Sequence, residues 1–220
     1  MPFLETLLIV GGARLAAHVL NKLSTPDSPR PSIDPPEKVI TFIGRTGVGK
    51  SSTANALLGY EAFATGSLHG TTEKVSQAIY RDGYSIMDTP GLFDTIDYSS
   101  EVWRAIRRSE IAIYTVIGQP YRTEMELIQE ISSSQNLWNK QVSYGSPRRL
   151  FLYVNQQDIH ESTKPKAVRE QLAEAIRTQV SAWISPSQIA FGAAAPMVHG
   201  QIQAGRVDEL KDLIHRHISK

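Results

Sequence analysis

The chain has 220 residues, a formal net charge of +1 and no cysteine, and 41% of its residues are hydrophobic. This length and hydrophobic content predict one packed domain with extensions and argue against a disordered chain. Without cysteine there is neither a disulfide framework nor a thiolate metal site, which fits a reducing cytoplasm, and the net charge gives no indication of nucleic-acid binding.

The first predicted element is an apolar segment, residues 2–23, which we interpret as an N-terminal helix within a region 1–23. Glu5, Arg14 and His18 interrupt it, whereas a membrane-spanning helix needs about 20 apolar residues with few charges. Three interpretations stay open: a helix docked on its own domain or on a second copy, a membrane attachment, or disorder.

Residues 24–37 are predicted to be a linker, because five of them are prolines: Pro26, Pro29, Pro31, Pro35 and Pro36. Proline fixes one backbone angle and lacks the N–H group that a helix needs, so such a run favours an extended polyproline conformation. The linker separates the N-terminal segment from a domain expected over residues 38–220.

Short apolar runs alternate with helix-period segments along this domain. Strands are predicted at 39–44, 75–80, 84–88, 111–117, 150–155 and 188–193, and helices at 51–58, 100–108, 121–134, 166–184 and 206–218. Alternating strands and helices indicate an α/β fold with a mostly parallel sheet covered on both faces. Only residues 81–83 separate the second and third strands, so one edge strand should be antiparallel.

The turn between the first strand and the first helix of the domain has the sequence GRTGVGKS, residues 44–51. It fits the phosphate-binding pattern G-x-x-x-x-G-K-[ST] in the expected strand–turn–helix context. Glycines let successive N–H groups point inward, and the helix N-terminus adds partial positive charge. Lys50 would reach the outer phosphates and Ser51 would ligate Mg²⁺. The predicted nucleotide contacts are Arg45, Thr46, Gly47, Val48, Gly49, Lys50, Ser51 and Ser52.

Two later segments are predicted to complete the phosphate and metal site. Asp88 ends the third strand in the sequence MDTPGLFDT and could hold Mg²⁺ through water, while the Gly91 N–H could sense a γ-phosphate. Thr72, in GTTEK, could enter the Mg²⁺ shell when the γ-phosphate is present, and Thr71 is nearly as good a candidate.

The sequence VNQQD, which ends the fifth strand, is predicted to select the base. The Asp158 carboxylate can accept from guanine N1–H and the 2-amino group, and adenine would leave it unpaired. Asn155 would brace this loop, and the Ala193 N–H after the sixth strand could meet the guanine O6. These positions favour GTP and GDP as ligands over an ATPase interpretation.

Residues 38–220 resemble a translation-factor-class GTPase domain. More narrowly, GRTGVGKSSTANALLG and DTPGLFDT resemble the immunity-associated and chloroplast outer-envelope import GTPases of the septin-like branch. The resemblance implies a three-layer P-loop NTPase G domain with a six-stranded sheet, binding of GTP and GDP with Mg²⁺, and homodimerisation through the nucleotide face. It also implies membrane contact through a terminal hydrophobic segment, here residues 2–23.

Three positions depart from the family pattern. Gln156 replaces the lysine of the guanine motif, so modest guanine affinity is expected, and Gly192 replaces the serine of the last motif. Leu92 follows the D-x-x-G glycine, where Ras-like proteins carry the glutamine that orients the attacking water. Slow intrinsic hydrolysis is therefore expected, with help from a second subunit or another loop, and Arg45 is the candidate donor from a second subunit.

The sequence thus predicts a slow GTPase whose catalytic residues are Lys50, Thr72 and Arg45, whose metal ligands are Ser51, Thr72 and Asp88, and whose base contacts are Asn155, Gln156, Asp158 and Ala193. Its nucleotide state would control dimerisation or partner and membrane association. The alternative is a GTP-gated scaffold at a membrane that does not hydrolyse GTP. The expected location is the cytoplasm, with membrane association as a second possibility.

Overall fold

The computed structural model describes residues 38–65, 74–92, 99–138, 149–195, 197–198, 201–202 and 205–218. The expected N-terminal helix and proline-rich linker therefore lie outside the described residues. Thr72 also lies outside the described residues, as do its neighbours in 66–73 and the residues after Leu92, 93–98.

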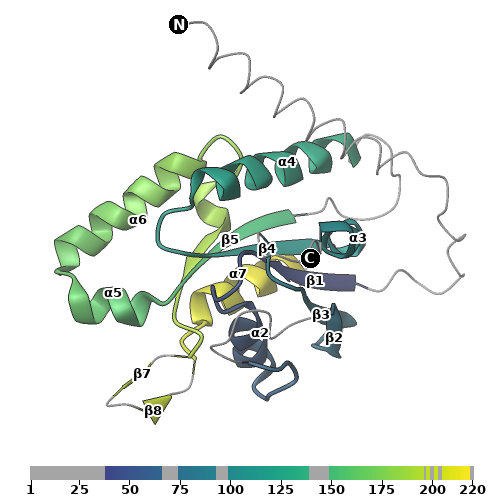
Figure 1. Ribbon diagram of the computed structural model, residues 1–220, viewed down its shortest axis with the longest axis horizontal. Helices are drawn as coiled ribbons and strands as arrows, with labels where there is room; N and C mark the ends of the chain where they lie inside the picture. Colours follow the sequence, from purple (N-terminus) through teal and green to yellow (C-terminus); the bar gives the residue numbers. More distant parts are fainter. Residues whose placement is uncertain are drawn as a thin grey trace, which may run out of the picture. The chain divides into compact units, whose positions relative to one another are not determined.

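The core of the fold is a six-stranded sheet with the strand order β2-β3-β1-β4-β5-β6 (Figure 1). All neighbouring pairs are parallel except β2 and β3, which confirms the predicted antiparallel edge strand. The strands are β1 (Lys38–Ile43), β2 (Ser76–Ile79), β3 (Tyr84–Asp88), β4 (Ile111–Ile117), β5 (Arg149–Asn155) and β6 (Ile189–Phe191). A two-residue pair that the sequence did not predict, β7 (Met197–Val198) and β8 (Gln201–Ile202), follows β6.

The hairpin between β2 and β3 turns at Asp82 and Gly83, which both have positive φ values, 54° and 76°. Consecutive positive φ values give a turn whose twist matches that of the flanking strands, and Asp-Gly is a preferred pair there. The turn is closed by the Tyr80 N–H, which donates to the Tyr84 carbonyl at 2.9 Å.

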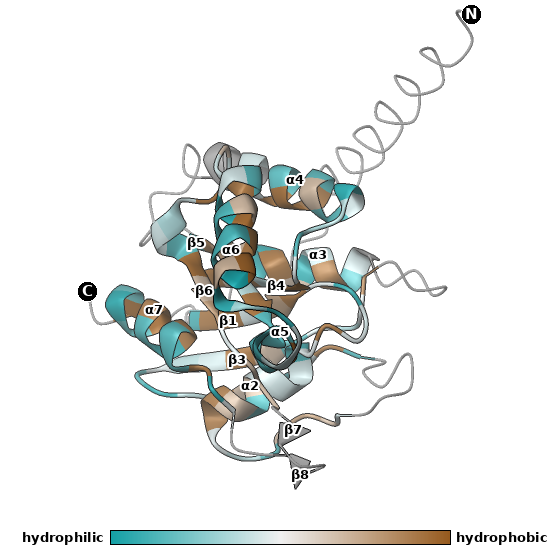
Figure 2. Cartoon of the chain, turned by 90° about the vertical axis from the view of Figure 1, so that its left-hand side faces the viewer, coloured by the Kyte–Doolittle hydropathy of each residue, from teal (hydrophilic) through white to brown (hydrophobic). Residues whose placement is uncertain are grey.

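Helices cover both faces of the sheet, as the strand–helix alternation predicted. One face packs on α2 (Lys50–Leu58) and α7 (Asp208–Ile218), and the other on α3 (Ser99–Arg108), α4 (Arg122–Trp138) and α6 (Lys166–Val180). Figure 2 shows the hydrophobic residues concentrated on the strands and on the helix sides that face them. This three-layer arrangement buries both faces of the parallel strands, which explains why they read as nearly continuous apolar runs.

Two details differ from the sequence prediction. The helix expected over 166–184 ends at Val180, and Val168, near its start, is 42% exposed, whereas Ile176 and Val180 are buried. A short helix, α5 (Gln157–Thr163), follows β5, where the sequence suggested only a loop. Its seven residues are too few and too polar to show a helical period.

Among the described residues, no helix combines the length and the hydropathy that crossing a bilayer requires.

Candidate functional site

The phosphate loop, residues 44–49, connects β1 to α2 through glycines in conformations that other residues rarely adopt. Gly44, Gly47 and Gly49 have φ values of 143°, 78° and 89°. A side chain at Gly44 would overlap the Thr115 carbonyl, and one at Gly49 would overlap the Asn155 amide. The loop therefore needs glycine both for its backbone angles and for its close contacts with β4 and β5.

The side chains that the sequence assigned to phosphate and metal converge at the start of α2. Lys50 is only 6% exposed, and its Nζ donates to the Arg45 carbonyl at 3.0 Å, across the loop. The Ser51 Oγ donates to Asp88 Oδ2 at 2.7 Å, and Asp88 is fully buried at the end of β3. A hydroxyl and a carboxylate side by side are oxygen ligands of the kind that Mg²⁺ takes with several waters and phosphate oxygens, so this pair fits the ion.

No group of three or more histidine, cysteine, aspartate or glutamate side chains that could hold a metal occurs in the described part of the chain. A Mg²⁺ site here would consequently depend on phosphate oxygens and water in addition to Ser51 and Asp88.

The segment after β3 is attached to the end of β1 and to the phosphate loop. Thr89 Oγ1 donates to the Phe42 carbonyl at 2.7 Å, and the Leu92 N–H donates to the Gly44 carbonyl at 3.1 Å. Gly91 lies against Thr46 so closely that any side chain at position 91 would overlap it. The Leu92 side chain packs on the buried cluster beneath α3, α4 and α6. It offers no polar group to a water at this position.

Arg45 is held by α4 of its own chain. Its Nε donates to Glu124 Oε1 at 2.8 Å, and its guanidinium lies 4.3 Å from the centre of the Tyr121 ring. Glu124 is only 1% exposed and also accepts from the Tyr121 N–H at 2.8 Å. Burial alone would lower the pKa of Arg45, but the hydrogen bond and charge of Glu124 outweigh it and raise that pKa. A role in a partner's site would require Arg45 to leave this contact.

Asn155 joins the phosphate loop to the segment after β6. Its Nδ2 donates to the Val48 carbonyl at 2.9 Å, and its Oδ1 accepts from the Ala194 N–H at 2.9 Å. The side chain is only 3% exposed. Both of its polar atoms are therefore used to hold backbone segments that are far apart in sequence.

The remaining residues of the predicted base motif lead into α5. Gln156 has a left-handed backbone, with φ 58° and ψ 36°, which costs a non-glycine residue about 1 kcal/mol. Asp158 is half-buried in the first turn of α5. A carboxylate is favoured there because the helix N-terminus carries partial positive charge.

The backbone of Ala193 is paired with Arg206. The Ala193 N–H donates to the Arg206 carbonyl at 3.0 Å, and the Arg206 N–H donates to the Ala193 carbonyl at 2.8 Å. The Ala193 amide, which the sequence suggested for guanine O6, is thus engaged within the chain. A contact with the base would have to share or replace that hydrogen bond.

Packing explains why glycine stands at position 192, where the family pattern has serine. A side chain at position 192 would overlap the Arg206 carbonyl and approach the Tyr153 hydroxyl to 2.6 Å. The space is filled by the chain's own C-terminal region, so a serine has no room here.

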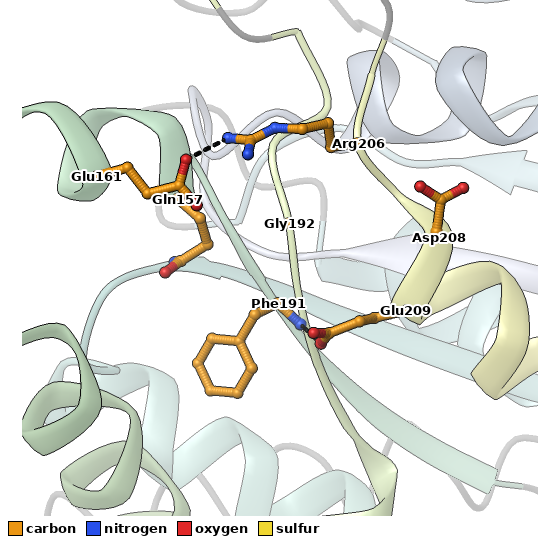
Figure 3. A pocket seen from close by; sticks show the side chains of 7 residues that line it. All are labelled: Gln157, Glu161, Phe191, Gly192, Arg206, Asp208 and Glu209. Carbon is orange, nitrogen blue, oxygen red and sulfur yellow. Dashed lines mark hydrogen bonds and ion pairs between the residues drawn. The ribbon is translucent and has the colours of Figure 1, made fainter. Parts of the chain in front are cut away.

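Behind the base motif lies a cavity of about 270 Å³, drawn in Figure 3. It is lined by Gln157, Glu161, Phe191, Gly192, Arg206, Asp208 and Glu209. Arg206 Nη2 donates to Glu161 Oε2 at 2.8 Å, and the Phe191 N–H donates to Glu209 Oε2 at 2.9 Å. Sequence analysis missed Arg206, Glu161 and Glu124, because each acts through a contact that no local motif encodes.

The chain is similar to known proteins over more than half of its length. A family model described as 50S ribosome-binding GTPase matches residues 39–156, more than half of the chain. Immune-associated nucleotide-binding protein 4 of Arabidopsis thaliana is 35% identical over 129 residues, covering 50% of the chain and 40% of that protein. The chain spans less than half the length of the curated relatives it matches.

Two solved structures show the same fold at low sequence identity. Aquifex aeolicus Era bound to GDP.AlF4- has a TM-score of 0.59 and 16% identity, covering 82% of this chain and 56% of that one. Era in complex with MgGDPNP and a segment of 16S ribosomal RNA has a TM-score of 0.58 and 14% identity, covering 83% and 56%.

Proposed function

Because the chain belongs to the 50S ribosome-binding GTPase family, we propose that its GTP-binding domain binds GTP and GDP with Mg²⁺, hydrolyses GTP slowly and uses the nucleotide state to control association. The associated partner would be a second copy, another protein or a membrane. The observation that carries the proposal is the convergence of Lys50, Ser51 and Asp88 at the phosphate loop, with Leu92 attached to the same loop.

The phosphate site would work through the chain's own donors. The loop N–H groups and the α2 N-terminus favour the negative charge of the phosphates. Lys50 would turn its ammonium group from the Arg45 carbonyl toward the outer phosphates. Ser51 and Asp88, joined by Thr72 from outside the described residues, would hold Mg²⁺. That ion would neutralise charge on the β- and γ-phosphate oxygens.

The base site would select guanine through Asp158. Its carboxylate can accept two hydrogen bonds from guanine, whereas adenine presents no matching donors and would leave a carboxylate unpaired. Asn155 keeps the loop against the phosphate site, and Gln156 would contribute less packing than the lysine of the family pattern. We therefore expect GTP and GDP to bind with modest affinity and ATP to be rejected.

Slow turnover is proposed from the chemistry of Leu92. A leucine cannot orient the attacking water, and loss of that positioning costs several powers of ten in rate. A second subunit facing the nucleotide would supply the missing group, so dimerisation would accelerate hydrolysis. The second candidate function is a GTP-gated scaffold, which the apolar packing of Leu92 favours.

Membrane contact through residues 2–23 and a cytoplasmic location are parts of the same proposal. The apolar sequence of that segment supports the first, and the absence of cysteine supports the second. The net charge of +1 gives no indication of nucleic-acid binding. The RNA in one Era structure is a reason to include RNA among the ligands to be assayed.

The test follows GTP turnover per molecule as the protein concentration is raised from nanomolar to tens of micromolar. We expect low activity at the lower end and a rise at the upper end, because the dimer fraction increases by mass action. A constant rate above background would show that one chain carries out catalysis alone. No turnover with GTP bound would replace the enzyme proposal by the scaffold. Lys50→Met, which lacks the ammonium group proposed to contact the phosphates, serves as the control for background turnover.

A further inference from the structure

We propose that Arg206 is a positioning residue for guanine recognition. It would tie α5, which carries Asp158, to the segment after β6, so that the two base-reading segments keep one fixed geometry. This inference rests on the proposed guanine-nucleotide binding.

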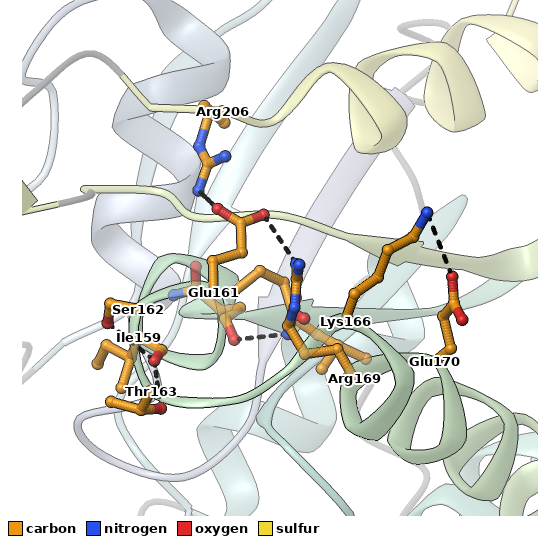
Figure 4. Close-up of polar contacts among 11 residues, drawn as sticks. Ile159, Glu161, Ser162, Thr163, Lys166, Arg169, Glu170 and Arg206 are labelled. Carbon is orange, nitrogen blue, oxygen red and sulfur yellow. Dashed lines mark hydrogen bonds and ion pairs between the residues drawn. The ribbon is translucent and has the colours of Figure 1, made fainter.

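The side chain of Arg206 holds α5 through Glu161. Its Nη2 donates to Glu161 Oε2 at 2.8 Å, as Figure 4 shows. Glu161 follows Asp158 by three positions on α5, so the two carboxylates belong to the same side of one short helix. A restraint on Glu161 therefore restrains the orientation of Asp158. The Arg169 Nη1, from α6, lies farther from the same carboxylate, at 3.7 Å from Oε1.

The backbone of Arg206 holds the other base-reading segment. Two hydrogen bonds, of 3.0 and 2.8 Å, pair it with Ala193 in both directions. The neighbouring Gly192 carbonyl accepts from the Gln157 N–H, the first residue of α5, at 3.0 Å. The contacts thus form a closed ring that runs from α5 to Gly192 and Ala193, on to Arg206, and back to α5 through Glu161.

Arg206 is itself fixed by its neighbours in sequence. Val207 is fully buried, and Glu209, in the first turn of α7, accepts from the Phe191 N–H of β6 at 2.9 Å. The position of Arg206 is consequently set by the packing of α7 on the sheet. The hydrogen bond to Glu161 raises the pKa of Arg206 most, against the lowering effect of burial, and the charges of Glu161 and Asp158 raise it further. The guanidinium therefore also lies within the field of the Asp158 carboxylate.

The size of the effect is limited by solvent. The side chains of Arg206 and Glu161 are 51% and 41% exposed, and ion pairs at such sites contribute little on their own. The pair therefore acts mainly on geometry, and its loss should relax base selectivity by about threefold to fivefold.

The experiment compares GDP with inosine diphosphate, which lacks only the 2-amino group that Asp158 would bind. Dissociation constants for both ligands are measured by calorimetry in the full chain with Mg²⁺. We expect the unmutated chain to prefer GDP by at least about tenfold. In Arg206→Met that preference should fall about threefold to fivefold, and Arg206→Lys should restore part of it. Adding Glu161→Gln to Arg206→Met should change the preference little further.

The matched control is Lys166→Met, which removes an exposed pair with Glu170 on α6 at 3.8 Å. It should leave both dissociation constants unchanged. If Arg206→Met weakens GDP and inosine diphosphate equally, or changes neither, the positioning role is wrong while guanine binding stands. A chain that binds neither ligand, or binds both equally before mutation, would contradict the proposed base recognition and this inference with it.

Discussion

The proposed phosphate-binding half and the proposed base-binding half of the site are built in different ways. The phosphate half consists of the phosphate loop, residues 44–49, the start of α2, and the end of β3 with the segment after it, which hydrogen-bond to them. The base half is assembled from α5, the segment after β6 and Arg206, whose contacts span long stretches of sequence. A contiguous motif can therefore specify the first half, whereas the second depends on how the strands and α7 pack.

The difference also separates two tasks. In the proposed function, the phosphate half would recognise a group that all nucleotides share, and the base half would discriminate between nucleotides. Asn155 connects the halves, because its amide contacts Val48 on one side and Ala194 on the other. Variants in each half, and in the connection, should consequently have distinct signatures.

The largest effect is expected for Asn155→Ala, which breaks the connection. It leaves a buried carbonyl and a buried N–H without their partner, at a cost of about 3 kcal/mol in the free energy of unfolding. Urea denaturation measures this loss, and both halves should suffer, so GDP binding should weaken too. A stability within about 0.5 kcal/mol of the unmutated chain would show that the two halves do not depend on this link.

Lys50→Met tests the phosphate half alone. The variant removes a charge-assisted hydrogen bond to phosphate, so the dissociation constant of GDP should rise about 100-fold. The preference for guanine over inosine should survive, because the base half is untouched. Lys38→Met, at the opposite end of β1 beside the Tyr84 ring, is the control and should bind GDP normally. Equal losses in both lysine variants would contradict the assignment.

Asp158→Asn tests the base half. The amide can donate to the 2-oxo group of xanthine, so preference should move from GTP to xanthosine triphosphate by about thirtyfold. The change is isosteric and half-buried, so stability should hold. Competition binding with the two triphosphates measures the shift, and unchanged GTP affinity would remove Asp158 from base recognition.

Variants of Arg45 test whether a second subunit contributes a residue to the phosphate half. If the guanidinium acts in a partner's site, Arg45→Ala should flatten the rise of turnover with protein concentration, lowering activity at tens of micromolar at least tenfold. Glu124→Gln keeps the guanidinium and weakens its restraint, so the rise should persist in that variant. Equal losses in the two variants would instead mean that Arg45 braces its own phosphate loop.

The smallest effect concerns His160 on α5. Burial and, secondarily, the charge of Lys164 lower its pKa below 6.5 in the native state. The unfolded chain therefore takes up this proton at a higher pH, and the stability present above pH 6.5 is lost as the pH falls through the native pKa. Urea denaturation at pH 7.5 and 5.5 measures how much the free energy of unfolding falls between the two pH values. This fall should be smaller in His160→Gln than in the unmutated chain. An identical fall in the two proteins would mean that His160 does not contribute to the pH dependence of stability.

The sequence predicted most of the fold because its signals are local. The central strands are buried apolar runs, and the Asp82-Gly83 turn identifies the antiparallel edge. The convergence of Lys50, Ser51 and Asp88 follows from one motif and the end of a neighbouring strand. Such features require only a correct order of strands and helices.

The features that the sequence did not predict depend on distant contacts. Arg45 and Glu124 are 79 positions apart, and their pairing depends on where α4 begins. Arg206 and Glu161 are 45 positions apart, and neither lies in a recognisable pattern. The pairing of the Ala193 amide likewise follows from the path of the chain before α7. Local spacing carries no information about these positions.

The central claim is that the base half restricts a general phosphate site to guanine nucleotides. The most direct measurement is a competition titration, in which GTP, GDP and ATP displace a fluorescent GDP from the purified chain with Mg²⁺. We expect GTP and GDP to compete at similar concentrations and ATP to fail even at a hundredfold excess. Such a failure means that ATP binds at least about 2.7 kcal/mol more weakly than GDP. ATP competing as well as GTP would contradict the central claim.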